Sequence, residues 1–172
     1  VSTAEWQGIP INGQIDKIEF YKDQITVVDY KTGKAQKAKV KAPEKVEENY
    51  QKYVAEEDPE NKDKLRLKYQ GTDYWRQLVF YKMLIESDKQ RNWKVSSGIM
   101  DFIEPEKKSN GDEIHLEVKV AISSKDMQTV SEQLKEAWFG IQNKEFSRMC
   151  GKKNCEWCQM NLGKENLKPK ES

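Results

Sequence analysis

The chain has 172 residues, of which 36% are hydrophobic and 34% are charged, and its formal net charge at pH 7 is +1. This length fits one soluble intracellular domain with a sizeable core, and its apolar runs are too short to span a membrane. No signal peptide is visible. Because the net charge is close to zero, attraction for nucleic acid has to come from local basic patches or an attached partner.

Two short strands separated by a polar turn are predicted near the start of the chain, from Ile11 to Phe20 and from Gln24 to Lys31. Both are rich in Ile, Val, Phe and Tyr, which is typical of a β-hairpin. Side chains alternate faces along a strand, so Asp29 and Lys31 point the same way, with Lys31 expected to be exposed at the strand end. If the pairing brings Asp16 over that face, two carboxylates and an ammonium group converge.

Such a set suits metal-dependent cleavage of a phosphodiester. Carboxylates hold a divalent cation, and a lysine orients a water molecule or steadies charge on the phosphate. An isolated Asp-x-Lys sequence is more often a surface ion pair at a strand end. The functional interpretation of Asp29 and Lys31 therefore depends on Asp16 and on the next helix.

A charged insertion is predicted from about residue 35 to residue 69. Basic residues dominate from Lys34 to Lys41, and the chain then becomes acidic from Glu44 to Asp63. We expect part helix and part loop, most mobile from about Lys41 to Lys64, because few apolar side chains offset the ordering entropy. The basic segment could track a phosphate backbone, and a solvated connector without a partner is equally open.

The next helix is predicted from about Thr72 to Ser87. Its apolar or aromatic residues recur at helical spacing, at Tyr74, Leu78, Tyr81 and Ile85. Gln77 and Tyr81 are four residues apart and therefore share a face. Taken alone, this pattern also fits a core helix whose Gln and Tyr form hydrogen bonds at its edge.

Two more strands are predicted from Lys94 to Glu104 and from Glu113 to Ile122, joined by a turn at residues 109–112. A helix then starts at Ser123, with Asp126 as its capping-box partner. Its apolar stripe is expected to be core and consists of Val130, Leu134, Trp138 and Ile141.

Three cysteines, Cys150, Cys155 and Cys158, lie together near the end of the chain with C-x4-C-x2-C spacing. This spacing indicates metal or cluster ligation more than disulfides. Four thiolates complete a zinc site or a [4Fe-4S] cluster, so a fourth ligand is required from elsewhere. An unligated tail at residues 149–172 is the alternative.

Three segments taken together resemble a known family: Gly13-Gln14-Ile15-Asp16-Lys17-Ile18, Val28-Asp29-Tyr30-Lys31-Thr32-Gly33-Lys34 and Gln77-Leu78-Val79-Phe80-Tyr81. Their order and their strand-strand-helix context look like the RecB-type nuclease domain of the PD-(D/E)xK superfamily. The resemblance covers roughly Gly8 to Cys158. It implies an α/β fold with a restriction-endonuclease-like core, in which a central mixed β-sheet is flanked by helices.

The resemblance also implies roles for individual residues. Asp16 and Asp29 would be the two acidic ligands of Mg2+ or Mn2+, and the backbone carbonyl of Tyr30 a further ligand. Lys31 would be the catalytic lysine. The motif that helps to position DNA and the active site would consist of Gln77 and Tyr81.

By the same resemblance, residues 1–148 would be a nuclease domain and residues 149–172 a cysteine-containing tail. Some relatives use three C-terminal cysteines and one far upstream to hold an iron-sulfur cluster, although with a different C-terminal spacing. The implied function is exonuclease-type cleavage of DNA in repair and recombination. The partners would be DNA and the helicase domains of a helicase-nuclease in the bacterial cytoplasm, and the alternative is a non-catalytic DNA-binding or scaffolding module.

The chain departs from the family pattern before its first strand. Family members usually have a helix there that carries a metal-binding His or Glu, and only about ten residues precede Ile11. We therefore expect a piece of a longer protein whose metal site is incomplete. The sole histidine, His115, is expected to be a surface strand residue.

Overall fold

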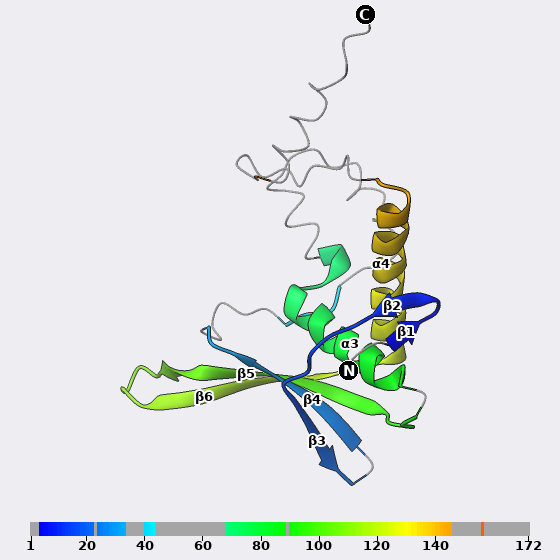
Figure 1. Cartoon of the computed structure of the whole chain (residues 1–172). Coiled ribbons are helices and arrows are strands. Elements are labelled where there is room, and N and C mark those ends of the chain that lie inside the picture. Colours follow the sequence, from blue (N-terminus) through cyan, green and yellow to red (C-terminus); the bar gives the residue numbers. More distant parts are fainter. Residues whose placement is uncertain are drawn as a thin grey trace, which may run out of the picture.

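The computed structural model describes residues 4–22, 24–33, 40–43, 68–88, 90–145 and 156. Its centre is a four-stranded sheet of β3 (Lys17–Tyr21), β4 (Gln24–Lys31), β5 (Val95–Lys107) and β6 (Glu113–Ala121), in that spatial order. The β3/β4 and β5/β6 pairs are antiparallel and the β4/β5 pair is parallel. Both described helices lie on one side of this sheet (Figure 1). The predicted class, an α/β fold with a mixed sheet flanked by helices, is confirmed.

The first predicted strand is shorter than expected. The β3 strand begins at Lys17, and the residues before it form a separate ribbon in which β1 (Ala4–Trp6) pairs antiparallel with β2 (Ile9–Ile11). The chain leaves the ladder where it passes close to a helix, since a Cβ added to Gly13 would lie 2.6 Å from Leu84 Cδ1. Residues 12–16 belong to neither strand, so the predicted continuous strand from Ile11 to Phe20 is wrong.

The helix α3 (Asp73–Glu86) supplies the crossover between the parallel strands β4 and β5, which parallel neighbours require. Its caps are Thr72 and Ser87, so the prediction from Thr72 to Ser87 is confirmed. The start of the helix is tied to an earlier segment, because the Thr72 N–H donates to the Lys41 carbonyl at 3.0 Å. The Lys41 N–H in turn donates to Thr72 Oγ1 at 3.0 Å.

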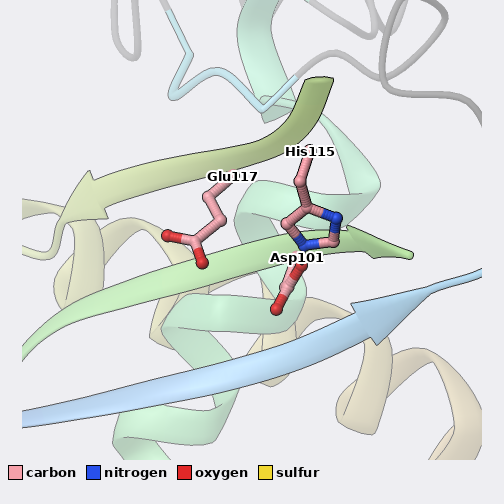
Figure 2. Close-up of side chains that lie close together, drawn as sticks. All are labelled: Asp101, His115 and Glu117. Carbon is pink, nitrogen blue, oxygen red and sulfur yellow. Dashed lines mark hydrogen bonds and ion pairs between the residues drawn. The ribbon is translucent and has the colours of Figure 1, made fainter. Parts of the chain in front are cut away.

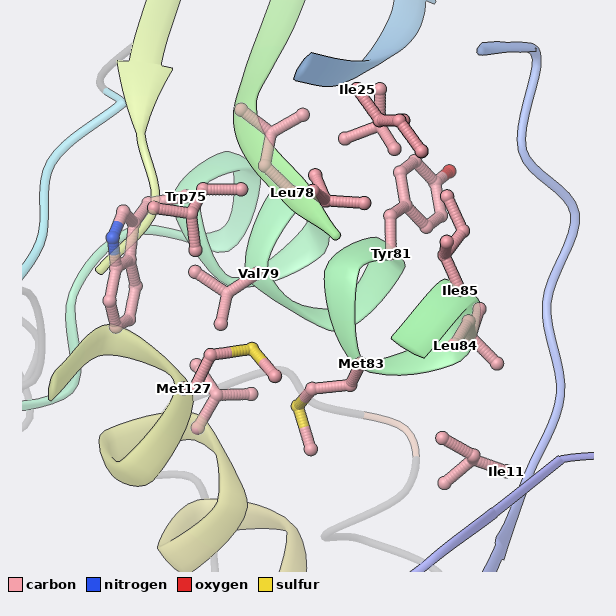
Figure 3. Close-up of a cluster of buried hydrophobic side chains, with 14 of the residues drawn as sticks. Ile11, Ile25, Trp75, Leu78, Val79, Tyr81, Met83, Leu84, Ile85 and Met127 are labelled. Atoms are coloured by element: carbon pink, nitrogen blue, oxygen red, sulfur yellow. The ribbon is translucent and has the colours of Figure 1, made fainter. Parts of the chain in front are cut away.

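The core lies between α3 and the sheet, and Figure 3 shows the part of it around the helix. A Cβ added to Gly98 on β5 would lie 2.8 Å from a Leu78 side-chain atom, so the helix sits directly on the strand. Burying each large aliphatic side chain contributes about 1.5–3 kcal/mol. The largest side chains below 2% exposure are Trp75, Phe102, Leu78, Met83, Leu84 and Met100.

The second described helix is α4 (Ser124–Gln142), which packs against α3. The predicted capping box is confirmed, because the Asp126 N–H donates to Ser123 Oγ at 3.2 Å and the Ser123 N–H donates to the Asp126 carboxylate at 2.8 Å. Val130 is buried, and Leu134 and Trp138 pack against the core. Ile141 is 55% exposed, so its prediction as core is wrong. The last turn of α4 lines an open groove between the two helices instead of a closed interface.

Two sets of predictions lie outside the described residues. Only 40–43 and 68–69 of the predicted insertion are described, so its helix content and its mobility are untested. Cys150, Cys155 and Cys158 are likewise outside the described ranges. Among the described residues, neither helix combines the length and apolar character needed to cross a membrane.

Candidate active site

A buried carboxylate lies near the carboxyl end of β4. Asp29 is 3% exposed and shares the helix-facing side of its strand with Val27 and Lys31, because side chains alternate along a strand. Burying an ionised carboxylate is costly unless it is paired and hydrogen-bonded. The side chains around Asp29 must therefore pair with its charge and donate hydrogen bonds to it.

Two donors from α3 meet one oxygen of this carboxylate. The Tyr81 hydroxyl donates to Asp29 Oδ1 at 2.7 Å, and Gln77 Nε2 donates to the same oxygen at 2.9 Å. Gln77 Nε2 and the Tyr81 hydroxyl are themselves 2.6 Å apart. The glutamine and tyrosine predicted to share a helical face thus both contact Asp29.

The ammonium group of Lys31 completes the cluster. Its Nζ lies 2.5 Å from Asp29 Oδ2 and donates to Gln77 Oε1 at 2.9 Å. It also lies 5.0 Å from the centroid of the Tyr74 ring, a favourable distance for a cation–π contact. The Lys31 side chain is only 20% exposed, so the expectation of an exposed strand-end lysine is wrong. The reason is that the helix-facing side of β4 stays covered by α3 up to the last residue of the strand.

The Gln77 side chain joins the two charged groups. Its carbonyl oxygen accepts from Lys31, and its amino group donates to Asp29. These two contacts fix the orientation of the amide, because a flipped amide would point its amino group at the ammonium. Gln77 therefore holds the acid and the lysine in a fixed relation.

Asp16 lies just before β3, and its Oδ2 accepts from the Tyr30 N–H at 3.0 Å. The register pairs Lys17 with Val28, so its continuation by one residue places Asp16 opposite Asp29. Directly opposed residues in an antiparallel pair face the same way. A shared ion between the two carboxylates stays a prediction.

The Tyr81 hydroxyl is affected by both acids. Burial is the main cause that raises the pKa of Tyr81 to about 12, followed by its hydrogen bond to Asp29. The charges of Asp29 and Asp16 act in the same direction, and the hydrogen bond with Gln77 opposes them. At neutral pH the hydroxyl is therefore protonated and available to donate to the carboxylate.

The donor set fits a hard divalent cation. Asp29 Oδ2 is buried and has no hydrogen bond, although the Lys31 ammonium forms an ion pair with it. A buried oxygen with unused acceptor capacity, a second carboxylate on Asp16 and the Tyr30 carbonyl would offer oxygen ligands, which Mg2+ and Mn2+ prefer. Within the described ranges, no third His, Cys, Asp or Glu forms a close group with Asp16 and Asp29.

A second polar cluster lies on the other face of the sheet. The ligand atoms of Asp101, His115 and Glu117 are all within 4.8 Å of one another. His115 is on β6 with its side chain 51% exposed, so its prediction as a surface strand residue is confirmed. Sequence reasoning missed Asp101 and Glu117. The alternation His115-x-Glu117 on a predicted strand was the one available signal.

Comparison with known families agrees with the class of protein that this fold and cluster define, a nuclease with a mixed sheet and an acid-lysine centre. A model of the PD-(D/E)XK nuclease superfamily matches residues 2–161. The chain belongs to the PD-(D/E)XK nuclease superfamily, and its sheet and helices are consistent with a restriction-endonuclease-like core. No curated protein and no solved structure gives a match.

Proposed function

We propose that this chain is the RecB-type nuclease domain of a bacterial helicase-nuclease that hydrolyses DNA from its ends during repair and recombination. Membership of the superfamily indicates nuclease function. The observation that carries the proposal is the cluster in which Tyr81, Gln77 and Lys31 all contact the buried carboxylate of Asp29. The same proposal divides the chain into a nuclease domain at residues 1–148 and a cysteine-containing tail at residues 149–172. It also includes a helicase partner and a location in the cytoplasm.

The residues of the cluster divide the chemistry between them. Asp16, Asp29 and the Tyr30 carbonyl would hold Mg2+ or Mn2+, and such an ion, when bound, polarises a phosphoryl oxygen and lowers the pKa of a water molecule. Tyr81 and Gln77 hold the Asp29 carboxylate in one orientation by donating to Oδ1, which leaves Oδ2 without a hydrogen bond.

Lys31 is held close to the reaction by groups other than the acid. Gln77 Oε1 accepts from its ammonium, and the Tyr74 ring lies beside it. These contacts keep the ammonium in place when the charge of Asp29 is engaged by a cation. From this position Lys31 orients the attacking water or steadies negative charge on the phosphate.

Attraction for DNA has a local source in the sequence. The net charge is only +1, but lysines dominate residues 34–41, which directly follow the strand that carries Asp29 and Lys31. Such a segment favours phosphate contacts whose strength falls with salt. DNA is therefore the substrate that the proposal assigns.

The test is degradation of end-labelled linear DNA by the purified folded chain with Mg2+ or Mn2+, beside the same reaction with chelator. We expect metal-dependent loss of linear DNA and no cutting of a covalently closed circle. DNA binding by the folded chain without metal-dependent cutting would favour the alternative, a non-catalytic DNA-binding module.

A further inference from the structure

The outer cluster is built by the pairing of two strands. Asp101 on β5 lies directly opposite Glu117 on β6, and His115 is two residues from Glu117 on the same face of its strand. Between the pairs Phe102↔Leu116 and Glu106↔Ile114, β5 contributes residues 103–105, whereas β6 contributes only His115. At such a bulge the strand bends and nearby side chains change direction, which accounts for the approach of His115 to Asp101.

The cluster faces away from the candidate active site. In the parallel pairing of β4 with β5, Asp101 is the partner of Tyr30, and Asp29 is the partner of Met100. Asp101 therefore shares a face with Tyr30 and not with Asp29. Figure 2 shows the three side chains on the side of the strands away from α3, which lies behind them.

The donor atoms are close but incompletely satisfied. His115 Nε2 lies 2.5 Å from Asp101 Oδ1, and the Asp101 side chain is only 14% exposed. Glu117 forms no hydrogen bond or ion pair with any described residue. Carboxylates directly opposite each other in a sheet repel, and the single imidazole offsets this repulsion only when it is protonated.

We propose that Asp101, His115 and Glu117 form a binding site for a divalent transition-metal ion of the Zn2+ type, which links β5 to β6 on the outer face of the sheet. One imidazole nitrogen and two carboxylate oxygens form a donor set that zinc accepts. Three protein ligands leave a further position for water. The ion removes the repulsion between the two acids and connects the strands where their ladder is interrupted.

The experiment uses the fact that His115 is the only histidine of the chain. Its ring resonances in an NMR spectrum therefore report this site alone. Zn2+ is titrated into a variant in which Cys150, Cys155 and Cys158 are replaced by serine, because thiolates also bind zinc. If that variant does not fold, the unmodified chain is titrated with Zn2+ in excess of its thiols, and the same ring signals are followed.

We expect the ring signals to shift and saturate with about one equivalent of Zn2+ at this site, and to be unaffected by Mg2+, which prefers oxygen ligands. Asp101→Asn and Glu117→Gln should each weaken binding by at least about tenfold. The matched control is Glu113→Gln, an exposed acid on the same face of β6 outside the cluster. Asp29→Asn should leave the shift unchanged, which separates this site from nuclease function.

Three outcomes would overturn the proposal. The ring signals could fail to respond to Zn2+, which would leave a His115–Asp101 ion pair and nothing more. They could respond equally in Glu117→Gln, or Glu113→Gln could weaken binding as much as the cluster variants. Either result would mean that the ion is attracted by general surface charge.

Discussion

The two faces of the sheet each carry a cluster of acids, but they hold their charges by different means. On the inner face, Asp29 is 3% exposed, and three neighbouring side chains contact its carboxylate. On the outer face, His115 and Glu117 are exposed, and one hydrogen bond joins His115 to Asp101. Burial removes water from Asp29, so its contacts must replace the lost hydration, whereas water reaches His115 and Glu117 on the outer face. The inner cluster should therefore respond strongly to substitution and the outer one weakly.

The largest effect is expected for Asp29→Asn. The amide keeps the shape of the side chain and its acceptor oxygen, so the fold should persist, but the charge of the proposed metal ligand is lost. Cleavage of linear DNA with Mg2+ should fall by about 100-fold to 1,000-fold or more. Glu113→Gln on the outer face is the matched control and should cut at the unmodified rate. Unchanged cleavage by folded Asp29→Asn would remove this carboxylate from the mechanism.

The next effect concerns Lys31→Ala, which should abolish cleavage. It also leaves the buried Asp29 carboxylate without the Lys31 ammonium. The free energy of unfolding measured in urea without metal should therefore fall by about 1–3 kcal/mol. This expected loss of stability is smaller than the loss for a fully buried ion pair, because the Lys31 side chain is 20% exposed.

A double-substitution cycle separates the two causes of that loss. In Lys31→Ala combined with Asp29→Asn, the buried charge is gone, so most of the destabilisation should disappear. Strictly additive losses would mean that the two side chains do not interact in solution.

A smaller effect is expected for Tyr81→Phe, which removes one donor to Asp29 Oδ1 and leaves the Gln77 donor in place. The free energy of unfolding should fall by about 1.5 kcal/mol. Tyr74→Phe is the control, since its ring lies beside Lys31 and its hydroxyl makes no hydrogen bond with the described residues; it should change stability by less than about 0.5 kcal/mol. Equal losses in both variants would contradict a specific role for the Tyr81 hydroxyl.

The smallest effect belongs to the outer face. Without added metal, His115→Ala should change the free energy of unfolding by no more than about 0.5 kcal/mol, because the His115 side chain is 51% exposed and already interacts with water. Thermal unfolding in chelator measures this directly. If His115→Ala lowered the free energy of unfolding as much as Lys31→Ala, the outer cluster would contribute as much stability as the inner one, which would contradict the comparison.

Local periodicity predicted the inner cluster well. Alternation along β4 placed Asp29 and Lys31 on one face of that strand, and helical spacing placed Gln77 and Tyr81 on one face of α3. Both rules relate residues only a few positions apart, so the sequence alone was enough. The burial of Lys31 could not be predicted in this way, since it depends on where α3 lies. The pairing of Asp101 with Glu117 depends on long-range strand register and on a bulge, which no local pattern specifies.

The backbone contacts between Lys41 and Thr72 have a consequence for how the protein can be altered. Two hydrogen bonds of 3.0 Å join Lys41 to Thr72. The residues just before Thr72 also belong to the fold, since Tyr69 is 6% exposed and the Gln70 carbonyl accepts from Gln133 Nε2 at 3.0 Å. These contacts fix the chain on both sides of residues 44–67, and doubling the length of a loop between fixed ends costs only about 0.6 kcal/mol. Insertions, short deletions or a grafted module within residues 44–67 should leave the placement of α3 unchanged, whereas changes at the buried Tyr69 should not. Residues 44–67 are therefore a suitable place to graft a second domain.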